Sequence, residues 1–210
     1  MKDVMTMSNL RIPTQKRSIE KKEKIVEKGF QLMCEKGFFN VTTPDIAKYA
    51  GVSTGIIYQY FKDKKDIFIE GTRKYANEIM FPIYSLIDGK NMNKEDLPQF
   101  FKELLKTNKE KHAIDKKAHQ EISAMQHLDE DVEQIFKEAE INFAHKLYLL
   151  LKGKGFPEEK LQEKTHLIVN LIDNFAHEEA YHKHKTLNYE AMEDMIVFSI
   201  LNILNYSFQE

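Results

Sequence analysis

The most constraining feature of the sequence is a glycine between two short helical segments, each with its own start signal. Thr43 and Pro44 form a typical helix start, a capping hydroxyl followed by a proline at the first helical position. Gly51 ends this segment, and Ser53 can cap a second helix over residues 54–61. Two short helices joined by a tight glycine turn predict a helix-turn-helix.

The packing of such a helix pair constrains further positions. Ala47 must be small where the two helices cross, Gly51 must adopt a positive φ, and Val52 must fill the gap between the helices. Ile57 and Phe61 then bury the inner face of the second helix. The outer face is left to contact a partner, and it carries Thr54, Gly55, Tyr58 and Gln59.

The rest of the sequence predicts more helices and no sheet. Apolar residues at helical spacing follow Ser18, a candidate N-cap, and Gly37 ends that helix. A longer helix is expected over residues 64–81, with a buried side made of Ile67, Phe68, Tyr75 and Ile79. No alternating strand pattern of convincing length occurs. The fold class is therefore all-α, with further helices expected over residues 94–111, 115–127, 129–152, 158–184 and 189–207.

The stretch from Ile25 to Phe68 closely resembles the DNA-binding domain of the TetR family of transcriptional regulators. The matching positions are Glu35-Lys36-Gly37-Phe38, Thr42-Thr43, Ile46-Ala47, Ala50-Gly51-Val52-Ser53, Gly55, Ile57-Tyr58, Tyr60-Phe61 and Lys64. The resemblance implies a three-helix DNA-binding domain in residues 1–66, of which residues 1–14 form a flexible arm. A larger helical domain for effector binding and dimerisation would follow in residues 67–210.

The resemblance also implies which side chains contact double-stranded DNA. In the family, the cap of the second helix holds a phosphate, which here corresponds to Thr43, and the third helix enters the major groove. Gly55 allows close approach because it has no Cβ, and Tyr58 can offer its hydroxyl to a phosphate. Lys64 adds positive charge near a helix N-terminus. The predicted DNA-binding residues are Lys16, Arg17, Thr43, Ser53, Thr54, Gly55, Ile56, Tyr58, Gln59, Tyr60 and Lys64.

The recognition helix departs from many family members in having no basic residue between Val52 and Phe61. Bidentate reading of guanine by Arg or Lys is therefore excluded there. We expect Thr54 and Ile56 to contact thymine methyl groups and Gln59 to read adenine. The predicted operator is rich in A·T pairs at the contacted positions.

The charge is unevenly distributed along the chain. Residues 1–89 hold 15 Lys and Arg against 11 Asp and Glu, whereas the remainder holds 16 against 22, for a net charge of -2. An asymmetry between segments suggests that they meet different partners, and here the more basic segment is the one that contains the helix-turn-helix.

The last predicted helix is apolar nearly all round, so it must be covered on more than one side. Its apolar residues are Met192, Met195, Ile196, Val197, Phe198, Ile200, Leu201, Ile203 and Leu204. In the family, the last two long helices pair with their copies in a four-helix dimer interface. We therefore expect a symmetric homodimer through these two helices, with recognition helices about 34–36 Å apart.

Apolar and polar residues in the second half of the sequence can be interpreted in two ways. They either fill a core or line a cavity that binds a small molecule, and the polar stripe is either a solvated helix face or a set of groups that orient a ligand. The resemblance implies an effector that releases a repressor from its operator, and the composition suggests an apolar or aromatic one. The candidate pocket residues are Phe100, Leu104, Met125, Phe143, Asn170, Asn174 and His177.

A metal centre is not expected, although all eight histidines lie beyond residue 110. His177 and His182 are five residues apart, which separates them by about 140° around a helix. Two Glu-x-x-His pairs ending at His166 and His182 lie on one predicted helix, about 24 Å apart. Neither arrangement converges on one ion, so no metal and no cofactor are predicted.

Two alternatives from other classes remain, an all-helical enzyme and a helical interaction module with no DNA-binding role. The enzyme lacks a nucleophile and base at recognisable spacing, so we expect that the chain is not an enzyme. The single cysteine, Cys34, excludes an intramolecular disulfide. Without a secretory signal or a membrane span in the sequence, a cytoplasmic location is predicted.

Overall fold

The computed structural model describes residues 10, 14–88, 93–112 and 116–206. These residues form helices and no strand, which confirms the all-α prediction. Most of the predicted flexible arm, residues 1–14, lies outside the described residues, and so does the side chain of Ile79. Among the described residues, no helix is both long and apolar enough to cross a membrane.

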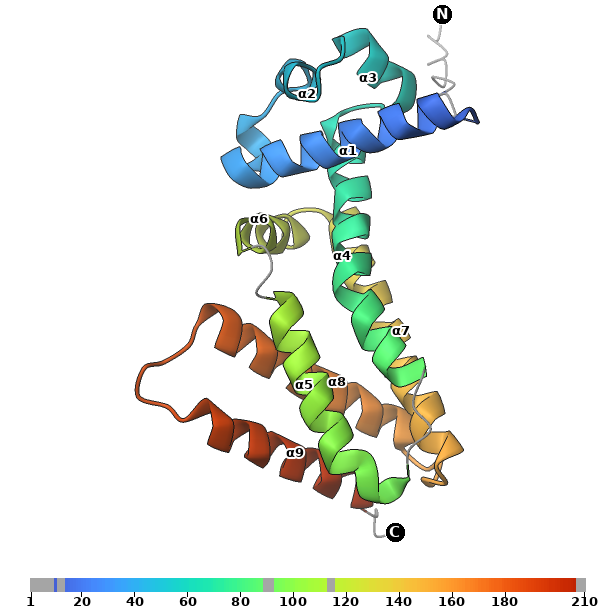
Figure 1. Ribbon diagram of the computed structural model, residues 1–210, viewed down its shortest axis with the longest axis vertical. Coiled ribbons are helices and arrows are strands. Elements are labelled where there is room, and N and C mark those ends of the chain that lie inside the picture. The colour runs from blue at the N-terminus through green and yellow to red at the C-terminus, as the bar shows by residue number, and fades with distance from the viewer. Residues whose placement is uncertain (1–9, 11–13, 89–92, 113–115, 207–210) are drawn as a thin grey trace, which may run out of the picture. The chain divides into compact units, whose positions relative to one another are not determined.

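The helices follow one another in the order shown in Figure 1. Their bounds are α1 Lys16–Lys36, η1 Phe38–Asn40, α2 Thr43–Ala50, α3 Thr54–Tyr60, α4 Lys64–Asp88, η2 Lys94–Asp96, α5 Leu97–His112, α6 Lys116–Gln126, α7 Glu130–Gly153, α8 Leu161–Tyr181 and α9 Tyr189–Asn205.

Helix α4 is longer than its sequence pattern predicts. It continues past Pro82 to Asp88, although we expected it to end near residue 81. A proline removes one backbone hydrogen bond from a helix. Ile83 and Ile87 are buried on the turns that follow, and burial of such a side chain contributes about 1.5–3 kcal/mol, which offsets the loss.

The chain divides into two compact units. The first consists of Met1–Tyr75 and Lys117–Glu133, and the second consists of Ala76–Lys116 and Gln134–Glu210. Helices α4 and α7 therefore contribute residues to both units, and α6 packs within the first. The functional domains expected at residues 1–66 and 67–210 remain a prediction.

The first unit places the helix-turn-helix on α1. α1 packs against α2, and α2 packs against α3, so that both short helices lie on the same side of α1 (Figure 1). Gly29 lets α1 approach α4 closely, because a Cβ at residue 29 would lie 2.7 Å from a methyl group of Ile67 on α4. The buried side chains of this core are Ile25, Val26, Leu32, Met33, Ile46, Ile57, Phe61, Ile67 and Phe68.

Helix α6 and the turn after it are held in the first unit by polar contacts. The backbone N–H of Phe38 donates to the Glu121 carboxylate at 2.5 Å. Lys65 Nζ lies 2.7 Å from Asp129 and 2.8 Å from Asp131, and we call these three residues the α6–α7 clasp. Burial opposes ionisation of Asp129, but the hydrogen bond and charge of Lys65 outweigh it, so the pKa of Asp129 is lowered.

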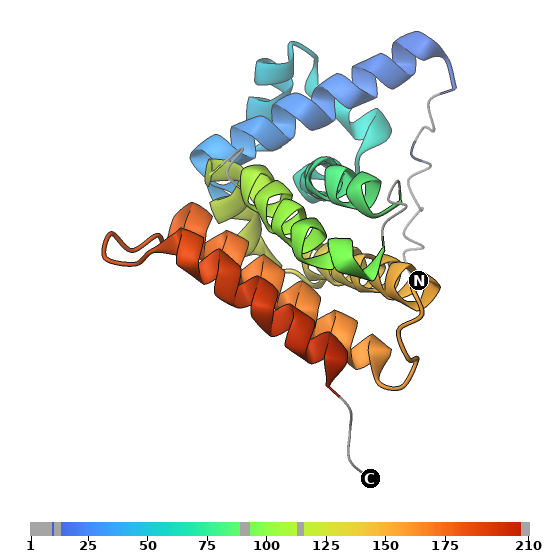
Figure 2. The same ribbon diagram turned by 60° about the horizontal axis from the view of Figure 1, so that its bottom comes forward.

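The second unit is a helical layer around an apolar core. Helix α9 lies along α8, and α5 packs against both, as Figure 2 shows. The core side chains include Phe100, Phe101, Leu104, Phe143, Leu147, Ile168, Ile172, Phe175 and Ile200.

Candidate nucleic-acid interface

Helix α2 begins at a capping box. The Thr42 hydroxyl accepts a hydrogen bond from Asp45 N–H, and Thr42 N–H donates to the Asp45 carboxylate at 2.9 Å. Hydrogen bonds from the Thr42 side chain and backbone lower the pKa of Asp45. The expectation that Thr43 caps α2 is therefore wrong, because Thr42 is the cap and Thr43 is the first helical residue, 9% exposed.

The turn between α2 and α3 has the geometry that the sequence predicts. Gly51 has φ 69° and ψ 40°, a left-handed conformation that favours glycine. The Val52 N–H donates to the carbonyl of Ala47 at 2.9 Å. Ala47 and Ala50 are buried beneath the turn. These contacts fix the direction in which α3 leaves α2.

Helix α3 has a buried inner face and an accessible outer face. Ile57 is fully buried, whereas Tyr58 is 53% exposed. Gly55 and Gln59 are exposed, and the predicted base-contacting residues Thr54 and Ile56 are half-buried. The outer face is therefore open to a partner.

Gly55 is not required by the packing of the protein itself. A Cβ at this position would meet only Ser53 Oγ, at 3.9 Å. The space that glycine leaves is therefore on the outside of α3, where a duplex would lie.

Tyr60 and Lys64 are held by the protein. Tyr60 is only 6% exposed, in contrast to Tyr58. Lys64 Nζ donates to the backbone carbonyls of Phe38 and Val41 at 2.6 and 2.7 Å, and lies 4.5 Å from the centre of the Phe38 ring. Both residues have a structural role here, and their contact with DNA remains a prediction.

The remaining predicted DNA-binding residues lie at helix starts. Lys16 and Arg17 form the first turn of α1, because the helix begins before Ser18, the predicted cap, and Gln15 takes the cap position. Both basic side chains are exposed, and Lys16 lies 4.0 Å from Glu20. Ser53 occupies the cap position of α3 without a side-chain capping hydrogen bond.

Sequence reasoning missed exposed residues of α2. Lys48 and Tyr49 are exposed on α2, opposite the buried Ala47 and Ala50. The helical period that identified the two alanines as buried would also have identified these two residues as accessible.

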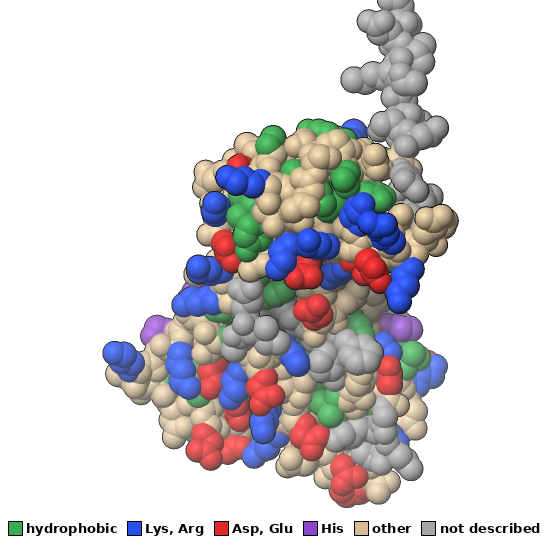
Figure 3. All heavy atoms as spheres, turned by 45° about the horizontal axis from the view of Figure 1, so that its top comes forward, with side chains coloured by type: hydrophobic (Ala, Val, Ile, Leu, Met, Phe, Trp, Pro, Cys, Tyr) green, Lys and Arg blue, Asp and Glu red, His purple; other side chains and the backbone are tan. Residues whose placement is uncertain are grey.

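Basic side chains are spread over the head that α1, α2 and α3 form, with acidic and apolar side chains between them (upper part of Figure 3). A mixed surface of this kind supplies positive charge for phosphate contacts at several points rather than one strongly basic groove.

The candidate effector residues are not all brought together. Phe100, Leu104 and Phe143 belong to the core of the second unit, whereas Met125 is buried in the first. The three candidate side chains on α8 are exposed or half-buried, and one of them, Asn174, donates to the backbone carbonyl of Asn170 at 2.8 Å. His177 lies against the ring of Tyr181, with ring centres 5.0 Å apart.

Comparison with known proteins bears on this site. Residues 25–70 match the family model of bacterial regulatory proteins, tetR family. The HTH-type transcriptional regulator HbdR of Aromatoleum sp. (strain CIB) is 46% identical over 48 residues, which are 23% of this chain and 21% of HbdR. The HTH-type transcriptional repressor BepR of Brucella suis biovar 1 (strain 1330) is 39% identical over 67 residues, 31% of this chain and 32% of BepR. The chain thus matches only a fifth to a third of the length of these relatives.

The likeness of fold extends over most of the chain. A crystal structure from Mesorhizobium loti MAFF303099, described as that of a TetR-family transcriptional regulator, has a TM-score of 0.69 to this chain. Its sequence is 18% identical to this one, and the superposed region covers 90% of this chain and 98% of the chain in that crystal structure. At this level of identity the comparison establishes the fold.

A helix-turn-helix with an accessible outer helix face is an arrangement typical of DNA-binding domains, and here a helical unit follows it. Residues 25–70 match the DNA-binding domain of the TetR family, as the resemblance of the N-terminal residues indicated. The relatives and structural neighbours are regulators, which agrees with the expectation that the chain is not an enzyme.

Proposed function

We propose that this chain is a homodimeric repressor that binds a double-stranded DNA operator through α3 and leaves it when a small molecule binds. The observation that carries the DNA-binding part is the division of α3 into a buried inner face and an open outer face. The inner side chain of Ile57 anchors the helix, so Tyr58 and Gln59 are presented at fixed positions.

The chemistry of α3 favours an operator rich in A·T pairs. Within α3 the described side chains include no Arg or Lys, so the recognition helix has no bidentate partner for guanine. Gln59 supplies an amide that suits adenine, and the methyl groups of Thr54 and Ile56 suit thymine. Lys16, Arg17, Ser53 and Lys64 complete the proposed set of DNA contacts, whereas Thr43 and Tyr60, which the sequence also predicts, are buried and support the helices that carry the set.

A homodimer is supported by large apolar side chains that α8 and α9 leave exposed. Leu167 is 58% exposed, Met195 is 65% exposed and Phe198 is 68% exposed. A second copy of the chain would cover these side chains, with a gain of about 25 cal/mol for each Å² of apolar area removed from water. The pairing would involve the last two helices, as predicted from the sequence.

An effector site in the second unit is supported by Asn108 on α5. Its side chain is 2% exposed, and its Nδ2 has no hydrogen-bond partner among the residues that the structure describes. A buried donor left unpaired costs about 1–3 kcal/mol, so it is suited to an acceptor on a bound molecule. Asn108 lies one helical turn from Leu104, whose apolar neighbours suit an apolar or aromatic effector.

In this proposal, residues 1–66 bind DNA, and residues 67–210 bind the effector and form the dimer. Release follows if the effector has a higher affinity for a conformation whose recognition helices no longer match the operator. A protein that binds the chromosome in this way works in the cytoplasm.

The test is sequence-specific DNA binding by the full chain. An operator would first be selected from a random duplex pool and then titrated by fluorescence anisotropy. Affinity should fall steeply with added salt, because phosphate contacts release counterions. Tyr58→Ala should weaken operator binding by about tenfold or more, because it removes the aromatic ring and the hydroxyl that contacts a phosphate.

Leu128→Ala is the matched control, because Leu128 is also exposed, lies in the first unit and is outside the proposed interface. It should bind the operator as the unmodified chain does. Failure to select any preferred sequence, or an unchanged affinity of Tyr58→Ala, would contradict the proposal.

A further inference from the structure

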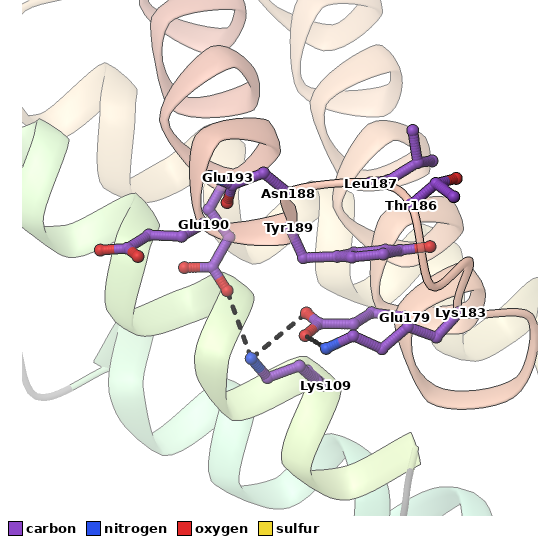
Figure 4. A pocket seen from close by; sticks show the side chains of 9 residues that line it. All are labelled: Lys109, Glu179, Lys183, Thr186, Leu187, Asn188, Tyr189, Glu190 and Glu193. Carbon is purple, nitrogen blue, oxygen red and sulfur yellow. Dashed lines mark hydrogen bonds and ion pairs between the residues drawn. The ribbon is translucent and has the colours of Figure 1, made fainter.

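The second unit contains a pocket of about 660 Å³ at the turn that joins α8 to α9, on the side of α5 (Figure 4). Residues 186–188 of the turn form one wall, and the other walls are strongly charged. The charged and aromatic side chains that line it are Lys109, Glu179, Lys183, Tyr189, Glu190 and Glu193. None of them belongs to the proposed DNA interface or to the candidate effector residues.

One wall of the pocket already holds an ammonium group, that of Lys183. Its Nζ lies 3.0 Å from Glu179 Oε1 and 4.7 Å from the centre of the Tyr189 ring. The Glu179 side chain is only 9% exposed, so its charge is poorly solvated. A buried carboxylate beside an aromatic face is a general arrangement for binding a cationic nitrogen.

The aromatic face is rigidly placed. Tyr189 is buried, and its hydroxyl donates to the Glu178 carboxylate at 3.1 Å. The same hydroxyl accepts a hydrogen bond from the backbone N–H of His184 at 2.8 Å. Both hydrogen bonds hold the ring in position without help from Lys183.

The two lysines of the pocket differ in how firmly they are held. Lys109 Nζ lies 3.2 Å from Glu179 Oε2 and 3.3 Å from Glu193 Oε1. Burial opposes the charge of Lys109, but the two carboxylates outweigh it and raise its pKa. The ion pair leaves Glu179 Oε2 buried without a hydrogen bond, since the ammonium is in range but not aligned. Lys183, in contrast, follows the end of α8, and its side chain is 56% exposed.

The lining carries three carboxylates and two ammonium groups, a net charge of -1. If Lys183 turns out into solvent, the net charge of the lining becomes -2, which a dication would neutralise. Glu190 extends to the opposite side of the pocket from Lys183 (Figure 4), and it lies at the start of α9.

We propose that this pocket binds a linear aliphatic diamine, of which one ammonium replaces Lys183 between Glu179 and Tyr189 while the other is neutralised by Glu190. In the absence of a ligand, the Lys183 ammonium thus occupies the position proposed for the ligand's ammonium. The pocket is separate from the proposed dimer face, because Met195 and Phe198 lie about 200° and 140° around α9 from Glu193.

The test is isothermal titration calorimetry of the full chain with 1,5-diaminopentane. Lys183→Ala removes the internal competitor and should bind the diamine about tenfold more tightly than the unmodified chain. Lys185→Ala is the matched control, because Lys185 is an exposed lysine of the same turn outside the lining, and it should bind as the unmodified chain does. Adding Glu179→Gln to Lys183→Ala should abolish binding.

Two further ligands separate the roles of the two ammonium groups. On Lys183→Ala, n-butylammonium should bind, and 1-butanol, which has the same chain without the charge, should not. Adding Glu190→Gln should weaken binding of the diamine and leave that of n-butylammonium unchanged. The proposal is overturned if Lys183→Ala gives no heat with the diamine, or if 1-butanol binds as well as n-butylammonium. The comparison of 1-butanol with n-butylammonium needs no Glu179 variant, so it tests the proposal even if that variant does not fold. No DNA is involved, so failure here leaves the proposed function untouched.

Discussion

Gly55→Ala should separate the stability of the protein from its affinity for DNA. Only Ser53 Oγ lies within 4 Å of a Cβ at residue 55, so alanine fits the folded chain. Replacing glycine by alanine at a compatible position stabilises a protein by about 0.4–1 kcal/mol. For a chain of this size that gain raises the melting temperature by about 1–4 °C.

The same methyl group should reduce operator affinity. If α3 lies against the duplex at Gly55, the methyl overpacks that contact at a cost of about 1–3 kcal/mol, or about 5- to 150-fold in affinity. Thermal melting followed by circular dichroism measures the first effect, and fluorescence anisotropy with the selected operator measures the second. Gly153→Ala is the matched control, because a Cβ at Gly153, the last residue of α7, also fits the folded chain and would meet nothing within 4 Å. It should leave operator affinity unchanged.

An operator affinity of Gly55→Ala equal to that of the unmodified chain would refute close approach of α3 at this position. A lower melting temperature would refute the inference that the space beside Gly55 is outside the protein, since it would mean that the methyl clashes internally.

Three further predictions concern stability and assembly. Gly71→Ala should destabilise the first unit by about 1–3 kcal/mol in urea unfolding, because the new Cβ would lie 2.4 Å from the ring of Phe30; an unchanged midpoint would contradict the close contact. Lys65→Ala should cost about 0.2–1 kcal/mol near neutral pH, because the clasp is partly exposed. Since the pKa of Asp129 is lowered in the folded chain, that contribution is present above its ordinary value of 3.8 and is lost as the pH falls through the lowered pKa. A difference in unfolding free energy between the unmodified chain and Lys65→Ala that persists at lower pH would contradict this. Phe198→Asp should give a monomer in sedimentation velocity, because a charge would be buried in the proposed interface; an intact dimer would exclude this part of α9 from it.

Local signals made the helix-turn-helix predictable from the sequence. A glycine that needs a positive φ, with small residues beside it, leaves few alternatives at Gly51 and Ala47. The error at Thr43 was also local, because two adjacent threonines can each cap a helix. The acid three residues after Thr42 distinguishes them, since Asp45 completes the capping box only with Thr42.

The predicted site included two tyrosines that one helix face cannot present together. Tyr58 and Tyr60 are two residues apart, about 200° around α3, so one is buried when the other is exposed. Helical geometry alone would have identified Tyr60 as the buried residue, given that Ile57 faces the core.

The position of α6 could not be predicted from the sequence. It depends on contacts between residues far apart in the chain, such as the hydrogen bond from Phe38 N–H to Glu121. These contacts place Met125 in the first unit, whereas the aromatic candidate residues Phe100 and Phe143 belong to the core of the second. Periodicity shows that a side chain is buried, but it does not show which core receives it.

The division of α3 has a consequence for how regulators of this kind diverge. Gln59 and its neighbours on the outer face contribute little to the packing of the core. They can therefore be replaced by other residues with changes in folding free energy within about 0.5 kcal/mol. Ile57, by contrast, is fixed by packing. A duplicated gene could therefore acquire a new target sequence by drift at a few outer positions, with no need for compensating changes elsewhere in the chain.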